Sequence, residues 1–107
     1  MKRLALALLM SLSLAAFAAD EPEFKLVIES HKFTPDRVEV PAGKKVKLVI
    51  ENKDSTPEEF ESKQLNREKV IPAGAKATLY IGPLKPGRYD FYGEYHESTA
   101  KGVVVAE

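Results

Sequence analysis

Residues 45–51 read Lys-Val-Lys-Leu-Val-Ile-Glu, and this stretch decides the fold class. Val46, Leu48 and Ile50 alternate with mostly charged residues at a period of two, which is the pattern of a β-strand with one buried face. The preceding Pro41-Ala42-Gly43 is a typical turn, because proline presets φ and glycine accepts a positive φ. The stretch therefore predicts a strand that enters from a tight turn and contributes one face to a core.

The same alternation recurs on both sides of this strand. Further short strands are expected at residues 24–28, 38–40, 59–61, 77–81, 89–91 and 103–105. Proline- and glycine-containing turns separate them at intervals of roughly 8–12 residues, which is typical of a Greek-key sandwich. A helical turn is expected only within residues 62–69. The sequence thus predicts an all-β, Greek-key β-sandwich in a single domain.

Length and composition exclude several classes of protein. A chain of 107 residues has room for one small domain. Its 16 basic and 16 acidic residues give a formal net charge of zero, which argues against nucleic acid as a partner. It contains no cysteine, so disulfides, thiolate zinc sites and type 1 copper sites, which need a Cys thiolate, are all excluded.

The first eighteen residues have the features of a cleaved signal peptide. Met1-Lys2-Arg3 is basic, residues 4–14 are almost wholly apolar, and Ala16-Phe17-Ala18 matches the small-x-small cleavage pattern. The apolar run is shorter than the roughly 20 residues of a membrane-spanning helix. We therefore expect cleavage after Ala18, a secreted domain over residues 19–107, and no membrane anchor in the mature chain.

Two short segments carry candidate metal ligands. On an extended strand Glu59 and Glu61 share one face, and in an extended loop Glu94 and His96 would face the same way. Imidazole with carboxylate oxygens suits Cu(II), iron or zinc. The alternatives are a solvated strand face, balanced by basic residues between positions 63 and 69, and an exposed loop histidine. His31 is interpreted as a surface residue.

No catalytic residue is predicted. The chain has no Gly-x-Ser-x-Gly elbow, no His-Glu-x-x-His and no glycine-rich phosphate loop. A small domain also leaves little room for a substrate pocket. Binding is therefore favoured over enzymatic activity.

Motifs distributed over the whole mature chain resemble a cupredoxin-like domain. They are Phe33-Thr-Pro, Val40-Pro-Ala-Gly-Lys, Leu48-Val-Ile-Glu-Asn52, Ser55-Thr-Pro-Glu-Glu-Phe-Glu-Ser62, Pro83-Leu-Lys-Pro-Gly-Arg-Tyr89, His96 and Lys101-Gly-Val-Val-Val105. The resemblance places Glu58, Gly93 and Ala100 where ordinary members carry a copper-binding His, Cys and Met. Only His96 is kept, so blue-copper electron transfer is excluded.

These departures are similar to those of the EfeO-type cupredoxin-like domains, periplasmic components of bacterial iron-uptake systems built around a ferrous-iron permease. The motifs are Ser-Thr-Pro-x-Glu-Phe-Glu-Ser, Arg-Glu-Lys before a Pro-x-Gly turn, and Phe-Tyr-Gly-Glu-Tyr-His-x-x-Thr-Ala. The resemblance implies a periplasmic location, partnership with that permease and other iron-uptake components, and a site for Cu(II) and/or iron. The ligands it implies are Glu59, Glu61, Glu68, Glu94 and His96. It also leaves open a ferroxidase role with bound copper.

A second hypothesis is a metal-free cupredoxin scaffold that acts as a periplasmic adaptor or interaction module. It would dock on the permease through Tyr92 and Tyr95, because tyrosine is favoured at interfaces. The two hypotheses differ in geometry. Metal binding needs the carboxylates close to His96, whereas carboxylates paired with Arg67 or Lys69 favour the adaptor. The oligomeric state and the native metal are left open.

Overall fold

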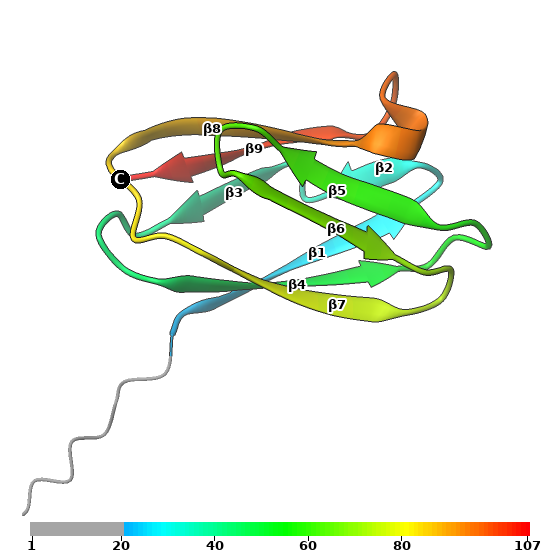
Figure 1. Cartoon of the computed structure of the whole chain (residues 1–107), viewed down its shortest axis with the longest axis horizontal. Helices are drawn as coiled ribbons and strands as arrows, with labels where there is room; N and C mark the ends of the chain where they lie inside the picture. The colour runs from blue at the N-terminus through cyan, green and yellow to red at the C-terminus, as the bar shows by residue number, and fades with distance from the viewer. Residues whose placement is uncertain (1–20) are drawn as a thin grey trace, which may run out of the picture.

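The computed structural model describes residues 21–107, which form nine strands and one short 3-10 helix, η1. The strands make two facing sheets, of order β2-β1-β4-β7 and β3-β9-β8-β5-β6 (Figure 1). The elements are β1 (Glu23–Glu29), β2 (Lys32–Thr34), β3 (Arg37–Val40), β4 (Val46–Asn52), β5 (Glu58–Ser62), β6 (Arg67–Ile71), β7 (Lys76–Ile81), β8 (Gly87–Gly93), η1 (Glu94–His96) and β9 (Lys101–Ala106). The predicted leader, residues 1–18, lies outside the described residues.

Strand pairing is mixed, and the order of the strands differs from their order in the chain. β1 pairs parallel with β4, and β3 pairs parallel with β9, whereas the other pairs are antiparallel. Three connections join neighbouring strands of one sheet, namely β1–β2, β5–β6 and β8–β9, and the others cross from one sheet to the other. The predicted all-β sandwich in a single domain is confirmed.

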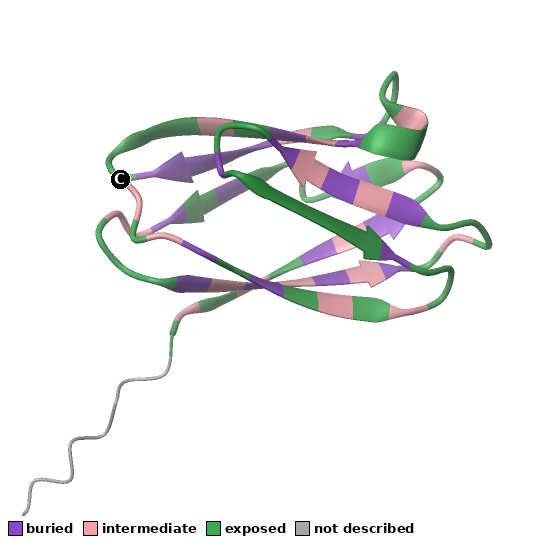
Figure 2. Ribbon diagram, in the orientation of Figure 1, coloured by how far each residue is buried: buried purple, intermediate pink, exposed green. Residues whose placement is uncertain are grey.

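The core lies between the two sheets and follows the predicted alternation. In β4, Val46, Leu48 and Ile50 are fully buried, while the residues between them are half-buried (Figure 2). Three phenylalanines pack at one end of this core: the ring centroid of Phe91 lies 4.9 Å from that of Phe33 and 5.0 Å from that of Phe60. Edge-to-face and offset aromatic contacts of this kind add about 0.5–1.5 kcal/mol beyond the area buried.

The structure corrects the prediction of a helical turn within residues 62–69. Residues 63–66 form a turn closed by the N–H of Asn66, which donates to the carbonyl of Lys63, with Asn66 at φ 56°. The chain then continues as β6, which pairs antiparallel with β5. β6 is an edge strand with four of its five residues exposed, so it lacks the alternation that would have predicted it.

One end of the sandwich collects the segments that matter for function. The β1–β2 turn, the β4–β5 loop, the start of β5 and η1 all lie there, as Figure 1 shows. The segment expected as an extended loop around residues 94–96 is instead the 3-10 helix η1. In the part of the chain that is described, no helix is long and apolar enough to cross a membrane.

Candidate metal centre

The outer face of β5 carries the acidic site. β5 alternates, so that Glu58, Phe60 and Ser62 are buried while Glu59 and Glu61 are half-buried on the opposite, outer face. Glu94, at the start of η1, reaches the same place. Carboxylate oxygens of Glu59, Glu61 and Glu94 all lie within 4.8 Å of one another. We refer to these three side chains as the carboxylate group.

Neighbouring strands extend this acidic surface. Glu68 of β6 is the cross-strand partner of Glu61, and Tyr92 of β8 is its partner on the other side. Residues paired across antiparallel strands share a face. Glu68 therefore adds a fourth carboxylate beside the group, and the Tyr92 ring borders it on the β8 side.

Hydrogen bonding, burial and neighbouring negative charges raise the pKa of two of these groups. A hydrogen bond to the Glu94 carboxyl, together with burial and the charge of Glu68, raises the pKa of Glu61 to about 7. Burial, followed by the charges of Glu68 and Glu94, raises the pKa of Glu59. Such shifts are expected where carboxylates cannot all ionise at short range without a compensating cation. The group therefore favours either protons or a bound cation.

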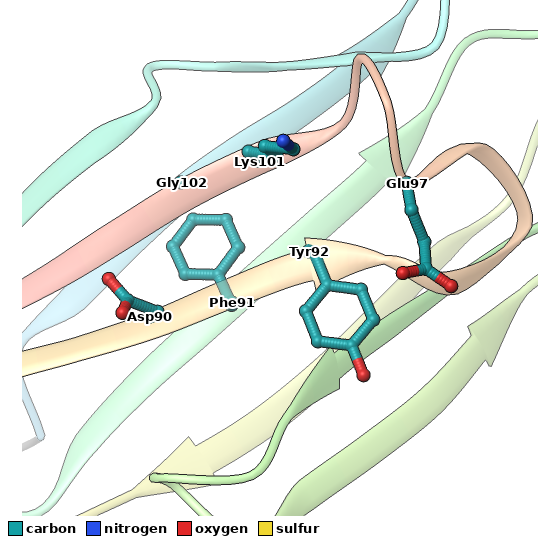
Figure 3. A pocket seen from close by; sticks show the side chains of 6 residues that line it. All are labelled: Asp90, Phe91, Tyr92, Glu97, Lys101 and Gly102. Carbon is teal, nitrogen blue, oxygen red and sulfur yellow. The ribbon is translucent and has the colours of Figure 1, made fainter.

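A shallow hollow lies next to the carboxylate group on the outer face of β8 and β9. It encloses about 330 Å³ and is lined by Asp90, Phe91, Tyr92, Glu97, Lys101 and Gly102. Figure 3 shows the Tyr92 and Glu97 side chains at one end of this hollow and Asp90 at the other. Burial, and then the charge of Glu94, raises the pKa of Tyr92, which places its phenol in the field of the group.

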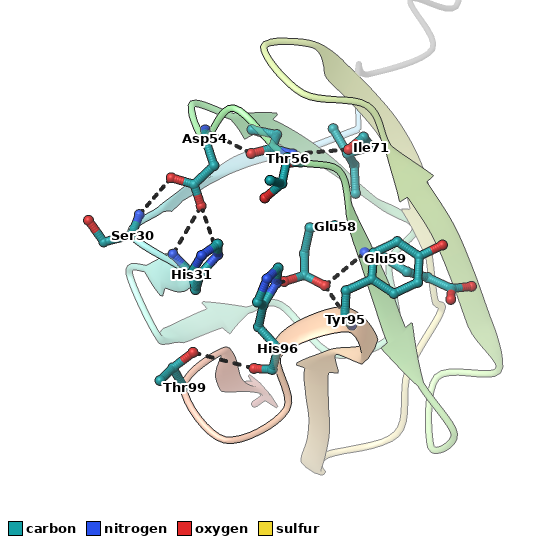
Figure 4. Close-up of polar contacts among 11 residues, drawn as sticks. Ser30, His31, Asp54, Thr56, Glu58, Glu59, Ile71, Tyr95, His96 and Thr99 are labelled. Carbon is teal, nitrogen blue, oxygen red and sulfur yellow. Dashed lines mark hydrogen bonds and ion pairs between the residues drawn. The ribbon is translucent and has the colours of Figure 1, made fainter.

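On the inner side of β5, Glu58 and His96 form a separate pair. The Glu58 side chain is 1% exposed, and its Oε2 lies 2.6 Å from Nδ1 of His96. An ionised carboxylate only accepts hydrogen bonds, so the ionised form of Glu58 requires the tautomer of His96 that carries its proton on Nδ1. Glu58 Oε1 accepts two backbone N–H groups, those of Glu59 and Tyr95, each at 2.9 Å (Figure 4).

His96 also packs on the second histidine of the chain. The rings of His31 and His96 stack with centroids 3.6 Å apart and planes 16° apart. His31 in turn lies beside Asp54, whose carboxylate accepts the backbone N–H groups of Ser30 and His31 (Figure 4). Asp54 Oδ2 is 3.5 Å from Nδ1 of His31, close enough for an ion pair but without a hydrogen bond. The backbone N–H of His31 lowers the pKa of Asp54.

The structure divides the five predicted ligands into two places. Glu59, Glu61 and Glu94 come together, with Glu68 beside them, whereas His96 lies against Glu58 and His31 instead of completing that group. The reason is the 3-10 conformation of η1: at about three residues per turn, positions two apart point in different directions. The extended loop that would have aligned Glu94 with His96 is not formed.

Basic side chains do not neutralise the carboxylate group. Within residues 21–107, no ion pair joins Glu59, Glu61, Glu68 or Glu94 to a lysine or arginine. Arg67 instead donates to the backbone carbonyls of Tyr80 and Asn66. The proposed balance by basic residues at positions 63–69 is therefore not observed as ion pairing.

Sequence reasoning missed the stacked histidines. His31 was interpreted as a surface residue, and its side chain is indeed 43% exposed, yet its ring covers that of His96. The available signal was that the only two histidines of the sequence both fall in segments that connect predicted strands. Asp54 gave no signal, because its role depends on two backbone N–H groups more than twenty residues away.

Type 1 copper does not fit these residues. Such a site needs a Cys thiolate, and the sequence has no cysteine. The space beside position 93 is taken by the Glu58 carboxyl: a Cβ on Gly93 would lie 2.6 Å from Glu58 Cδ and 2.7 Å from Ala100 Cβ. The Glu58 carboxyl and the Ala100 methyl group thus fill the place into which a cysteine side chain at position 93 would project.

Comparisons of structure place the chain among known β-sandwiches. It superposes with a TM-score of 0.71 on the metal-binding domain of the Cu(I)-exporting ATPase CopA of Streptococcus pneumoniae, at 13% identity, covering 79% of this chain and 84% of that one. It superposes equally well, 0.71, on the blue copper protein auracyanin A of Chloroflexus aurantiacus, at 11% identity, covering 82% and 100%. These likenesses show the fold alone.

Comparisons of sequence show the family. The chain is 45% identical over 83 residues to the uncharacterized protein RP394 of Rickettsia prowazekii (strain Madrid E), covering 78% of this chain and 66% of that protein. It therefore spans just under two thirds of that relative's length. The family model described as a cupredoxin-like domain matches residues 2–106. The chain accordingly belongs to the cupredoxin-like domain family.

Proposed function

We propose that this protein is a periplasmic, EfeO-type metal-binding protein that holds Cu(II) or iron in the carboxylate group and assists iron uptake through a membrane permease. The observation that carries the proposal is the approach of three carboxylates, Glu59, Glu61 and Glu94, to within 4.8 Å, with no ion pair to a lysine or arginine among residues 21–107. The hydrogen bond to Glu94, burial and the charge of Glu68 raise the pKa of Glu61, and a cation bound there would take the place of the proton that they favour.

The donor atoms indicate which metals suit the site. All donors of the carboxylate group are oxygens, with the Glu68 carboxylate and the Tyr92 phenol beside them. Oxygen ligands favour hard or borderline cations over Cu(I), which prefers thiolate and thioether sulfur. The site lies on an outer sheet face with Glu94 exposed, which suits a cation that must be handed over.

The transport role is supported by the motifs that resemble EfeO-type domains and by the features of a signal peptide at residues 1–18. The copper named for the structural relatives belongs to those proteins, whose likeness to this chain is one of fold. The expected partner is a ferrous-iron permease together with other periplasmic iron-uptake components.

A calorimetric titration of the purified chain with Cu(II), Fe(II) and Fe(III) citrate tests the proposal. We expect saturable binding of about one ion per chain, weakened about tenfold or more by Glu59→Gln and Glu61→Gln, because each removes an anionic ligand. Glu29→Gln, the same change on an exposed strand residue of the other sheet, is the matched control and should leave binding unchanged. Absence of saturable binding contradicts the proposal. So does a Glu59→Gln/Glu61→Gln double variant that binds the metal as tightly as the unsubstituted chain.

The engagement of His96 by Glu58 and His31 favours a second candidate, the metal-free adaptor. It withdraws the imidazole from the carboxylate group, and Tyr95 beside it is 48% exposed. Under this alternative the chain binds no metal, and Tyr95→Ala weakens its association with the permease. A ferroxidase role would instead appear in the same titration as Fe(II) oxidation above the buffer rate when Cu(II) is bound.

A further inference from the structure

Both carboxylate oxygens of the buried Glu58 are in hydrogen-bonding contact with other groups of the protein. It is 1% exposed, Oε1 accepts the backbone N–H groups of Glu59 and Tyr95, and Oε2 faces Nδ1 of His96 at 2.6 Å. Burying an ionised carboxylate costs several kcal/mol unless its oxygens are satisfied. Three hydrogen-bonding partners on its two oxygens meet that requirement. Glu58 is thus held in place by the protein, and it is not one of the proposed metal ligands.

The two backbone N–H groups on Oε1 belong to the two segments that carry the carboxylate group. One is that of Glu59 itself, at the start of β5, and the other is that of Tyr95, the residue after Glu94. These residues are 36 positions apart in the chain. A single oxygen atom therefore links the backbone of η1 to the backbone of β5, directly beyond the β5–β8 pairing that ends at Gly93 (Figure 4).

The two hydrogen bonds that Glu58 Oε1 accepts from Glu59 and Tyr95, which we call the Glu58 clamp, act against the mutual repulsion of the ligands. Glu59, Glu61 and Glu94 are all acidic and form no ion pair with a lysine or arginine in the described structure, so their ionised forms repel one another and oppose the approach of η1 to β5. Gly93 makes the clamp possible, because a side chain there would occupy the position of the Glu58 carboxyl. His96, whose ring stacks on the His31 ring, contacts the second oxygen of Glu58, Oε2, through Nδ1.

We propose that Glu58 is a positioning residue for the carboxylate group: by accepting the N–H groups of Glu59 and Tyr95 on one oxygen, it keeps Glu94 beside Glu59 and Glu61 so that the three bind one cation. The inference rests on the proposed function. It assigns Glu58 a structural part in binding, without contact to the metal.

The test compares Glu58→Ala with Glu58→Gln in the full chain, using Cu(II) alone as the probe. Gln keeps an oxygen that can accept both N–H groups, and its amide can donate to Nδ1 of His96 in the other tautomer. We expect Glu58→Ala to weaken Cu(II) binding by about 10- to 100-fold, as removal of an outer-shell partner typically does. The Cu(II) affinity of Glu58→Gln should stay within about threefold of that of the unsubstituted chain. Glu29→Ala is the control and should not change the affinity.

Two further readouts separate positioning from general loss of stability. In the metal-free chain, hydrogen exchange of the Tyr95 amide should accelerate in Glu58→Ala and stay protected in Glu58→Gln. At saturating Cu(II), the electron paramagnetic resonance spectrum of Glu58→Gln should match that of the unsubstituted chain, because Glu58 is not a ligand.

The outcomes distinguish this inference from the function on which it rests. Unchanged Cu(II) affinity in Glu58→Ala, or equal loss in the Ala and Gln variants, overturns the positioning role while leaving the carboxylate site intact. Failure of the unsubstituted chain to bind Cu(II) overturns the proposed function, and the positioning role with it.

Discussion

The pKa of Glu61 is raised from an ordinary 4.5 to about 7. The causes are its hydrogen bond to the Glu94 carboxyl, its burial and the charge of Glu68, all of which oppose ionisation of Glu61. A group whose pKa is raised by folding stabilises the fold fully at pH values below its unfolded pKa, and that contribution is lost as the pH rises through its folded pKa. The metal-free chain should therefore lose stability between about pH 5 and pH 8, in contrast to the gain expected from salt-bridged carboxylates.

Glu61→Gln should flatten this pH dependence, because the amide stays neutral throughout the range. Urea unfolding at both pH values, with a chelator present, measures it. Glu29→Gln, which removes one carboxyl from the other sheet, should keep the slope of the unsubstituted chain. A Glu61→Gln variant that loses stability with pH as steeply as the unsubstituted chain would show that crowding at Glu61 is not its cause.

At the scale of elements, alternation predicted the strands that have one buried face and one wet face. β4 and β5 are examples, with burial changing at every residue. β6 escaped prediction because four of its five residues are exposed at a sheet edge. η1 escaped because three residues are too few to establish a helical period, so the direction of Glu94 relative to His96 was not accessible from the sequence.

The β4–β5 loop, which brings Asp54 to His31, depends on one buried amide. Asn52 is fully buried, its Nδ2 donates to the carbonyls of Thr56 and Ile71, and its Oδ1 accepts the N–H of Asp54. Asn52→Ala leaves these backbone groups unpaired and should lower the free energy of unfolding by about 1–3 kcal/mol.

The urea midpoint measures that loss, with an unchanged m-value as the sign that only stability has changed. Lys53→Ala, an exposed change on the next residue, is the control and should stay within about 0.5 kcal/mol of the unsubstituted chain. A cost for Asn52→Ala as small as that of the control would mean that the loop holds its shape without the amide.

At the scale of the whole molecule, the site is a product of topology more than of local sequence. β5 lies between β6 and β8, so Glu61 receives Glu68 from one side and Tyr92 from the other. The motifs indicated which glutamates to consider, because Glu59 and Glu61 share a strand face. They could not indicate that the inner face of the same strand would bind His96 through Glu58, since that contact spans 38 residues.

Cation binding should therefore be visible in the stability of the whole fold. A ligand that binds only the folded state at 100 times its Kd stabilises it by about 2.7 kcal/mol, and in a domain of this size each kcal/mol shifts Tm by about 4–8 °C. We expect Cu(II) at that concentration to raise Tm by about 10 °C or more at about pH 7.5. The rise should be smaller at about pH 5.5, because protons on Glu61 compete with the metal. Scanning calorimetry of the unsubstituted chain against the Glu59→Gln/Glu61→Gln double variant checks this, and an equal rise in both would place the metal outside the carboxylate group, for instance on the exposed edge of the stacked histidines.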